Sequence, residues 1–158
     1  MRLFAGWAAA ALLVVLAGCG SKTSDPQATP KSASAKPAVQ WVETYEQAVT
    51  QGKQQRKPVM VDVMASWCGV CKKLDVQLWT RDDVAKISDG FVAAKVDGDK
   101  RPDLKSKLKV SGYPTTLFLT ADGKELGRVR GLVASEDMIE AMQDALKQHS
   151  QVSSAGGS

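Results

Sequence analysis

Hydrophobic and polar residues divide the chain into three parts. Residues 3–16 are almost wholly apolar, residues 20–38 are small or polar, and beyond Trp41 short apolar runs alternate with polar stretches. Only this last part repeats its apolar residues at the spacings that bury one face of a helix or a strand. It therefore forms the expected domain, residues 39–149, and about 110 residues are enough for one compact core.

Within this domain, β-branched and aromatic runs predict four strands, and apolar residues at helical spacing predict five helices. The strands are expected at residues 59–65, 91–96, 115–120 and 126–130, with a hairpin turn at 121–124. The helices are expected at residues 41–52, 70–78, 82–87, 102–108 and 135–149. This order predicts an α/β fold with a central mixed sheet of four to five strands, flanked by helices on both faces.

The apolar run near the N-terminus is typical of an export signal. Arg2 precedes the run, which is too short to span a membrane comfortably. It ends in residues 16–19 (LAGC), which resemble the lipobox of bacterial lipoproteins. By that resemblance, residues 1–18 are a signal peptide, and Cys19 becomes the acylated first residue that binds the lipid membrane. The alternative is an ordinary signal peptide with an incidental cysteine.

The expected anchor implies a place in the bacterial cell envelope, facing the periplasm. Gly20 stands where an inner-membrane lipoprotein of a Gram-negative bacterium often has aspartate, which favours the outer membrane if there are two. Residues 19–38 are then a lipidated cysteine and a disordered tether, whose nineteen polar residues span roughly 25 Å. Residues 150–158 are small and polar and are expected to form a flexible tail.

The charge of the chain does not indicate nucleic-acid binding. There are 21 Lys and Arg residues against 17 Asp and Glu residues, a formal net charge of +4, and both signs are interspersed. A nucleic-acid surface needs a concentrated basic face, so no nucleic-acid partner is expected.

The candidate metal ligands are too few for a familiar site. A closed zinc site needs four Cys or His ligands, whereas the domain offers Cys68, Cys71 and His149. Residues 97–99 (DGD) resemble part of a calcium loop, but its terminal glutamate is missing, so a strand-to-helix turn is expected instead. Neither a metal nor another cofactor is expected.

Cys68 and Cys71 are the main candidates for chemistry. They are two residues apart and lie where the apolar run 59–65 gives way to helical spacing. Because Cys19 is explained by lipidation, these two cysteines are expected to pair with each other as a reversible dithiol and disulfide. A purely structural disulfide stays open, since a lone C-x-x-C motif is a weak signal.

Three separate stretches resemble the thioredoxin superfamily. Residues 61–72 (VDVMASWCGVCK) hold the two cysteines, residues 94–97 (AKVD) hold a lysine, and residues 112–115 (GYPT) resemble the family's cis-proline loop. They occur in the family's order and spacing, and the resemblance covers about residues 41–148. It implies a thioredoxin-like fold for the whole domain.

Two further stretches resemble one group of proteins within this superfamily. Residues 57–62 and 71–74 look most similar to the C-terminal periplasmic domain of membrane thiol-disulfide interchange proteins, which pass electrons outward. Gly69 and Val70 depart from the proline of thioredoxin and from the histidine of many oxidising relatives. The reduction potential, and with it the direction of electron flow, therefore stays open.

The resemblance gives roles to the residues around the cysteines. Cys68 is the attacking thiolate at a helix N-terminus, with a lowered pKa, and buried Cys71 resolves the mixed disulfide. Asp62 is expected to be buried with a raised pKa and to accept the proton of Cys71, while Lys95 tunes it. The alternatives are an aspartate at a strand edge for Asp62 and an exposed strand lysine for Lys95.

The resemblance also indicates where a substrate binds. Trp67 is expected to pack against the active-site loop and shield the disulfide, or else to pack in the core. A cis peptide before Pro114 leaves the Tyr113 backbone to pair with an extended substrate segment. Gly69 and Val70 belong to the same substrate-binding surface.

These expectations combine into a membrane-anchored protein-disulfide oxidoreductase that reduces disulfide-containing envelope proteins. With one redox pair, it needs a membrane electron donor or another thiol redox partner. The alternatives are a copper(I)-binding carrier, because soft thiolates suit that ion, a disulfide isomerase or oxidase, and a non-catalytic scaffold.

Overall fold

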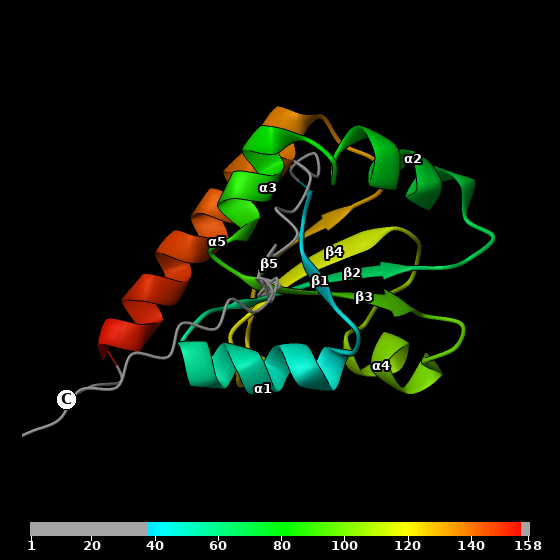
Figure 1. Cartoon of the computed structure of the whole chain (residues 1–158). Helices are drawn as coiled ribbons and strands as arrows, with labels where there is room; N and C mark the ends of the chain where they lie inside the picture. Colours follow the sequence, from blue (N-terminus) through cyan, green and yellow to red (C-terminus); the bar gives the residue numbers. More distant parts are fainter. Residues whose placement is uncertain (1–37, 156–158) are drawn as a thin grey trace, which may run out of the picture. The chain divides into compact units, whose positions relative to one another are not determined.

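The computed structural model describes residues 38–155, which form a five-stranded sheet with helices on both faces (Figure 1). The strand order is β1-β3-β2-β4-β5. Strands β1, β3 and β2 are parallel to one another, β4 is antiparallel to β2, and β5 is antiparallel to β4. The strands are β1 (Trp41–Val42), β2 (Val59–Met64), β3 (Val92–Asp97), β4 (Thr115–Leu119) and β5 (Glu125–Arg130). The predicted α/β class and mixed sheet are confirmed.

Five helices cover the two faces of the sheet. They are α1 (Tyr45–Gln55), α2 (Gly69–Gln77), α3 (Asp82–Ser88), α4 (Pro102–Lys107) and α5 (Ser135–Ala155). Helices α1 and α4 lie on one face, and α2, α3 and α5 lie on the other (Figure 1). Among the described residues, no helix is long and apolar enough to cross a membrane.

The side chains of β2 point alternately to the two faces of the sheet. Val59, Val61 and Val63 are fully buried in the core beneath α1 and α4, whereas Met60 belongs to the core beneath α2, α3 and α5. Because successive side chains of a strand point to opposite faces, Asp62 shares the face of Met60. The one charged residue of the strand is thereby directed toward α2.

The chain before α1 differs from its prediction. Trp41 and Val42 pair with Ala93 and Ala94 in the sheet, and the helix begins only at Tyr45. The reason is the cap: Thr44 is extended, and its hydroxyl accepts the backbone N–H of Gln47 at 3.1 Å.

The end of α1 also differs. Gly52 was expected to stop the helix, but it lies inside it, where a Cβ would come within 3.0 Å of the Val59 side chain. Arg56, in the left-handed conformation at φ 54°, ends the helix instead. Gly52 thus allows close packing of α1 on the sheet.

The last helix corrects the predicted tail at residues 150–158. Helix α5 continues to Ala155, and the hydroxyls of its serines donate to carbonyls within the helix. The Ser150 hydroxyl donates to the Lys147 carbonyl at 2.7 Å, and the Ser154 hydroxyl donates to the Ser150 carbonyl at 2.9 Å. The proposed signal peptide, Cys19 and the tether up to residue 37 lie outside the described residues.

Candidate active site

The two cysteines form a disulfide at the start of α2. Cys68 is the N-cap residue, and Cys71 lies one helical turn further on, with 5.3 Å between their Cα atoms. The backbone N–H of Cys71 donates to the Cys68 sulfur at 3.1 Å. The expected pairing is confirmed. In the reduced protein, this N–H and the helix N-terminus favour negative charge on Cys68.

The surroundings of the disulfide are buried on one side and open on the other. Cys68 and Cys71 are 5% and 2% exposed, and Met64, Ala65 and Tyr113 pack against them. The neighbouring residues of the turn point outward: Gly69 is exposed, Val70 is 43% exposed and Trp67 is 70% exposed. The alternative that Trp67 packs in the core is therefore wrong.

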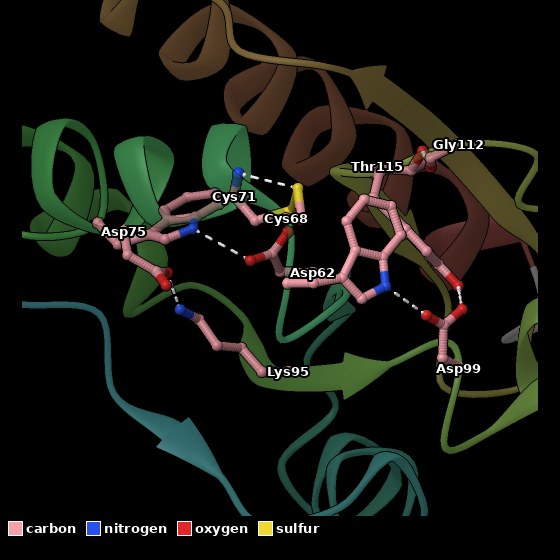
Figure 2. Close-up of a disulfide and its surroundings, with 11 residues drawn as sticks. Asp62, Cys68, Cys71, Asp75, Lys95, Asp99, Gly112 and Thr115 are labelled. Carbon is pink, nitrogen blue, oxygen red and sulfur yellow. Dashed lines mark hydrogen bonds and ion pairs between the residues drawn. A yellow bond between two sulfur atoms is a disulfide. The ribbon is translucent and has the colours of Figure 1, made fainter.

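Asp62 lies behind the disulfide and is almost completely buried, at 1% exposure. Figure 2 shows its side chain directed from β2 toward the cysteines. The Trp79 indole N–H donates to Asp62 Oδ2 at 3.2 Å, whereas Oδ1 has no partner among the described residues. The strand-edge alternative is wrong, because β2 is paired on both sides.

Burial raises the pKa of Asp62 to about 6, as the sequence led us to expect. The positive charge of Lys95 opposes this rise in pKa, the nearby Asp75 carboxylate adds to it, and the hydrogen bond from Trp79 lowers it. Desolvation exceeds the effect of these partners. Asp62 can therefore gain and lose a proton near neutral pH.

Lys95 lies directly opposite Asp62 on the neighbouring strand β3. Its ammonium group forms an ion pair with Asp75 of α2 (Figure 2) and lies 4.9 Å from the ring centroid of Trp41. The side chain is only 28% exposed, so it is not a freely exposed strand lysine. Its predicted tuning role remains a prediction, now with a position that permits it.

Asp75 and Trp79 were missed by sequence reasoning. They follow Cys71 at intervals of four residues, the spacing that places side chains on one face of a helix. That spacing was the available signal. The hydrophobic pattern contains only apolar residues and predicts a helix that ends at residue 78, so it includes neither the charged Asp75 nor Trp79, which lies just beyond the end of α2.

The second loop beside the disulfide carries Pro114. The Tyr113–Pro114 peptide bond is cis, as predicted, and Pro114 is buried. The backbone N–H of Gly131 donates to the Pro114 carbonyl at 2.9 Å, which ties the loop to the end of β5. Within residues 38–155, the Tyr113 backbone forms no hydrogen bond with another backbone group.

Asp99, which follows β3, connects the two loops. Its carboxylate accepts hydrogen bonds from the Trp67 indole and from the Tyr113 hydroxyl, both at 2.8 Å (Figure 2). These two donors hold the pKa of Asp99 below its usual value. The sequence predicted only a strand-to-helix turn here, and residues 98–100 do form a turn. This bridge was missed.

His149 and the cysteines are not brought together. His149 lies on α5, where its Nε2 is 3.2 Å from the Arg56 carbonyl at the end of α1. Among residues 38–155, no three His, Cys, Asp or Glu side chains are grouped to hold a metal ion.

The sequence of this chain is similar to those of known proteins. A family model described as a thioredoxin-like domain matches residues 45–146. Thioredoxin Y1, chloroplastic, of Arabidopsis thaliana is 30% identical over 128 residues, which cover 80% of this chain and 69% of that protein. The thiol:disulfide interchange protein DsbD of Cronobacter sakazakii is 31% identical over 112 residues, which cover 67% of this chain but only 19% of that protein.

Several solved structures have a fold similar to that of this chain. A structure described as DsbH oxidoreductase has a TM-score of 0.62 at 26% identity, covering 78% of this chain and 94% of that one. The solution structure of a thioredoxin from Thermus thermophilus has a TM-score of 0.58 at 25% identity, with 76% and 91% covered. The C-terminal domain of Neisseria meningitidis DsbD, at 23% identity and a TM-score of 0.55, shares the fold.

Proposed function

The chain belongs to the thioredoxin-like family of thiol-disulfide oxidoreductases, and from this premise we propose that it reduces protein disulfides in the bacterial cell envelope. The observation that carries the proposal is the Cys68–Cys71 disulfide, which caps α2 in front of a buried acid, Asp62, whose pKa is raised to about 6. A structural disulfide has no need of a proton acceptor behind it.

The reaction begins with the reduced protein. The Cys68 thiolate attacks one sulfur of a substrate disulfide, and the other substrate sulfur leaves as a thiolate and takes a proton from solvent. Cys68 and the substrate are then joined by a mixed disulfide. The helix N-terminus and the Cys71 N–H favour the attacking thiolate.

Resolution requires a second thiolate. Cys71 passes its proton to Asp62, either directly or through water, and its sulfur attacks Cys68. The second substrate sulfur leaves as a thiolate and takes a proton from solvent, and two electrons have moved from the protein to the substrate. Asp62 suits this step because Oδ1 is unoccupied by any described donor and the carboxyl group titrates near neutral pH.

The surface around Cys68 suits a protein substrate. Trp67 and Val70 are exposed apolar side chains next to the disulfide, and Leu132, at 40% exposure, follows Gly131 beside Pro114. Exposed apolar residues gathered at one place are typical of binding surfaces. The Tyr113 backbone beside them forms no backbone hydrogen bond within residues 38–155, so it can bind an extended segment by strand-like hydrogen bonds.

The anchor and the place in the cell belong to the same proposal. The lipobox-like residues 16–19 and the polar residues 20–38 support lipidation at Cys19 and a tether facing the periplasm. The sequence similarity to DsbD supports electron flow toward envelope substrates, with a membrane electron donor or another thiol redox partner restoring the dithiol. Gly20 supports an outer-membrane site if there are two membranes.

The test uses the mature protein, beginning at Cys19, and insulin as the substrate. With dithiothreitol as the donor, the wild type should reduce insulin, and Cys71→Ser should accumulate mixed disulfides through Cys68. The matched control is the double variant Cys68→Ser with Cys71→Ser, which should trap none. A folded wild type with neither activity nor trapped partners would refute the proposal.

A redox titration against glutathione decides the direction of electron flow. A potential near the −270 mV of thioredoxin supports a reductant, and one near the −120 mV of DsbA indicates an oxidant instead. Tight, stoichiometric binding of copper(I) without turnover of disulfides would favour a carrier.

A further inference from the structure

The two loops beside the disulfide meet at one carboxylate. Trp67 belongs to the loop between β2 and α2, and Tyr113 belongs to the loop before β4. Both donate to Asp99 at 2.8 Å, and their ring centroids are 6.1 Å apart in an edge-to-face arrangement. We call these two side chains the aromatic rim. Asp99 is the residue that forms a hydrogen bond to both of them.

Gly98 makes the room that the aromatic rim needs. A Cβ built on Gly98 would lie 2.5 Å from the Tyr113 hydroxyl oxygen and 2.7 Å from its Cε1. Real Cβ atoms essentially never approach so closely, so the Tyr113 ring rests directly on the backbone of residue 98. Gly98 does not have a positive φ, so its backbone conformation does not require glycine. The space for Tyr113 does.

Lys105 completes the arrangement from the other side. Its ammonium group lies 4.6 Å from the centroid of the Tyr113 ring and 3.9 Å from Asp99 Oδ1. The cation therefore faces both the ring and the carboxylate that binds the hydroxyl. Tyr113 is held on three sides, by Gly98, by Asp99 and by Lys105, while its ring packs against the Cys68–Cys71 cluster.

We propose that Gly98 and Asp99 are positioning residues for the recognition of protein substrates: they fix the aromatic rim beside the disulfide before a substrate binds. This inference rests on the proposed function. Trp67 is 70% exposed, so without its bond to Asp99 it would sample several orientations. Fixing a side chain in advance removes the cost of ordering it on binding, which corresponds to roughly two- to tenfold in affinity for each side chain.

Protein substrates and small disulfides should differ in how much their reaction depends on the rim. A folded substrate segment must contact the rim while its disulfide reaches Cys68. A small aromatic disulfide such as dithiobis(nitrobenzoate) needs only access to the sulfur. Loss of the rim should therefore raise KM for a protein substrate, and it should affect the reaction with the small disulfide less. The proton acceptor Asp62 is on the other side of the cysteines and bonds to Trp79, not to the rim.

The test compares two glycine-to-alanine variants of the mature protein. Gly98→Ala forces Tyr113 away from Asp99, whereas Gly127→Ala places a Cβ in ordinary contact, 3.8 Å from Phe118, in the middle of β5. With insulin, Gly98→Ala should raise KM about three- to tenfold at unchanged kcat. Gly127→Ala should match the wild type with both substrates. With dithiobis(nitrobenzoate), Gly98→Ala should lose less than it loses with insulin, because this small substrate does not need the rim, although the displaced Tyr113 ring also packs against the cysteines.

Tyr113→Phe provides a second, independent variant in case Gly98→Ala does not fold. It keeps the ring and removes only the hydroxyl that donates to Asp99, so KM for insulin should rise at least twofold. An unchanged KM in both variants, or an equal loss with both substrates, would overturn the inference. A wild type that reduces neither substrate would instead refute the proposed function itself.

Discussion

Asp62→Asn in the oxidised protein tests the electrostatics of the buried acid. The disulfide removes the cysteines from titration, so the carboxyl group can be followed alone. Asparagine has nearly the same shape, and its Oδ1 can still accept the Trp79 N–H that now reaches Asp62 at 3.2 Å. The substitution therefore removes the charge and leaves the packing of β2 in place.

The pKa of Asp62 sets the size of the effect. It is about 6 in the folded protein against a model-peptide value of 3.8, and this difference corresponds to about 3 kcal/mol, at 1.36 kcal/mol for each pH unit. Because the folded pKa is raised, the stabilisation by the neutral carboxyl is fully present below about pH 4. It is lost as the pH rises through about 6.

The expected result is a stability difference that grows with pH. Relative to the wild type, Asp62→Asn should gain about 3 kcal/mol in free energy of unfolding between pH 4 and pH 8. The unpartnered amide N–H₂ of asparagine adds a penalty of about 1–3 kcal/mol that does not depend on pH. Only the change with pH is therefore informative.

Urea unfolding of both oxidised proteins at several pH values, followed by circular dichroism, measures this difference. Asp99→Asn serves as the control, because the pKa of Asp99 is lowered from 3.8, so its contribution is lost only below about pH 4 and its difference from the wild type should stay constant between pH 4 and pH 8. A difference between Asp62→Asn and the wild type that stays constant from pH 4 to pH 8 would refute the reasoning.

Three further predictions use the same structure. Lys95→Met removes the charge that favours ionised Asp62, so the pH-dependent loss of stability should move above about pH 6; a downward shift would contradict it. Trp79→Phe removes a donor to Asp62 and should shift the midpoint pH of this stability loss upward. Trp41→Phe keeps the bond from Trp79 and should shift the midpoint less. Equal shifts would argue against a role for the Trp79 indole. Met142→Ala opens a cavity where α5 packs on the sheet and should cost about 2–5 kcal/mol in urea unfolding, whereas a loss below about 1 kcal/mol would mean that α5 is weakly attached.

Four of the five strands and the redox pair could be predicted from the sequence, whereas β1 was expected to be helical. The β-branched residues of β2 predict a strand, and the spacing of Cys68 and Cys71 just after it indicates a redox pair. These features are local, since a strand or the first turn of a helix is decided by neighbouring residues. Ends of elements were less predictable: Thr44 and Arg56 set the limits of α1 through cap geometry that the hydrophobic pattern does not contain.

The contacts that tune the site depend on residues distant in sequence. Trp79 reaches Asp62 across 17 positions, and Trp67 reaches Asp99 across 32. Nothing in the local pattern of either pair specifies the other, because the sheet register and helix packing bring them together. The spacing of Asp75 from Cys71 could place it on the same helix face, but its ion pair with Lys95 depends on the packing of α2 against β3.

A C-x-x-C pair at the start of a helix, an acid in the preceding buried strand and a proline loop elsewhere are all visible in the sequence. They are properties of order, spacing and side-chain chemistry. In contrast, the folded chain alone shows that the acid is sealed behind the disulfide with one oxygen bound by Trp79, and that Gly98 and Asp99 join the two loops. Desolvation and steric room depend on all the residues that surround a place in the fold, and no single stretch of sequence specifies them.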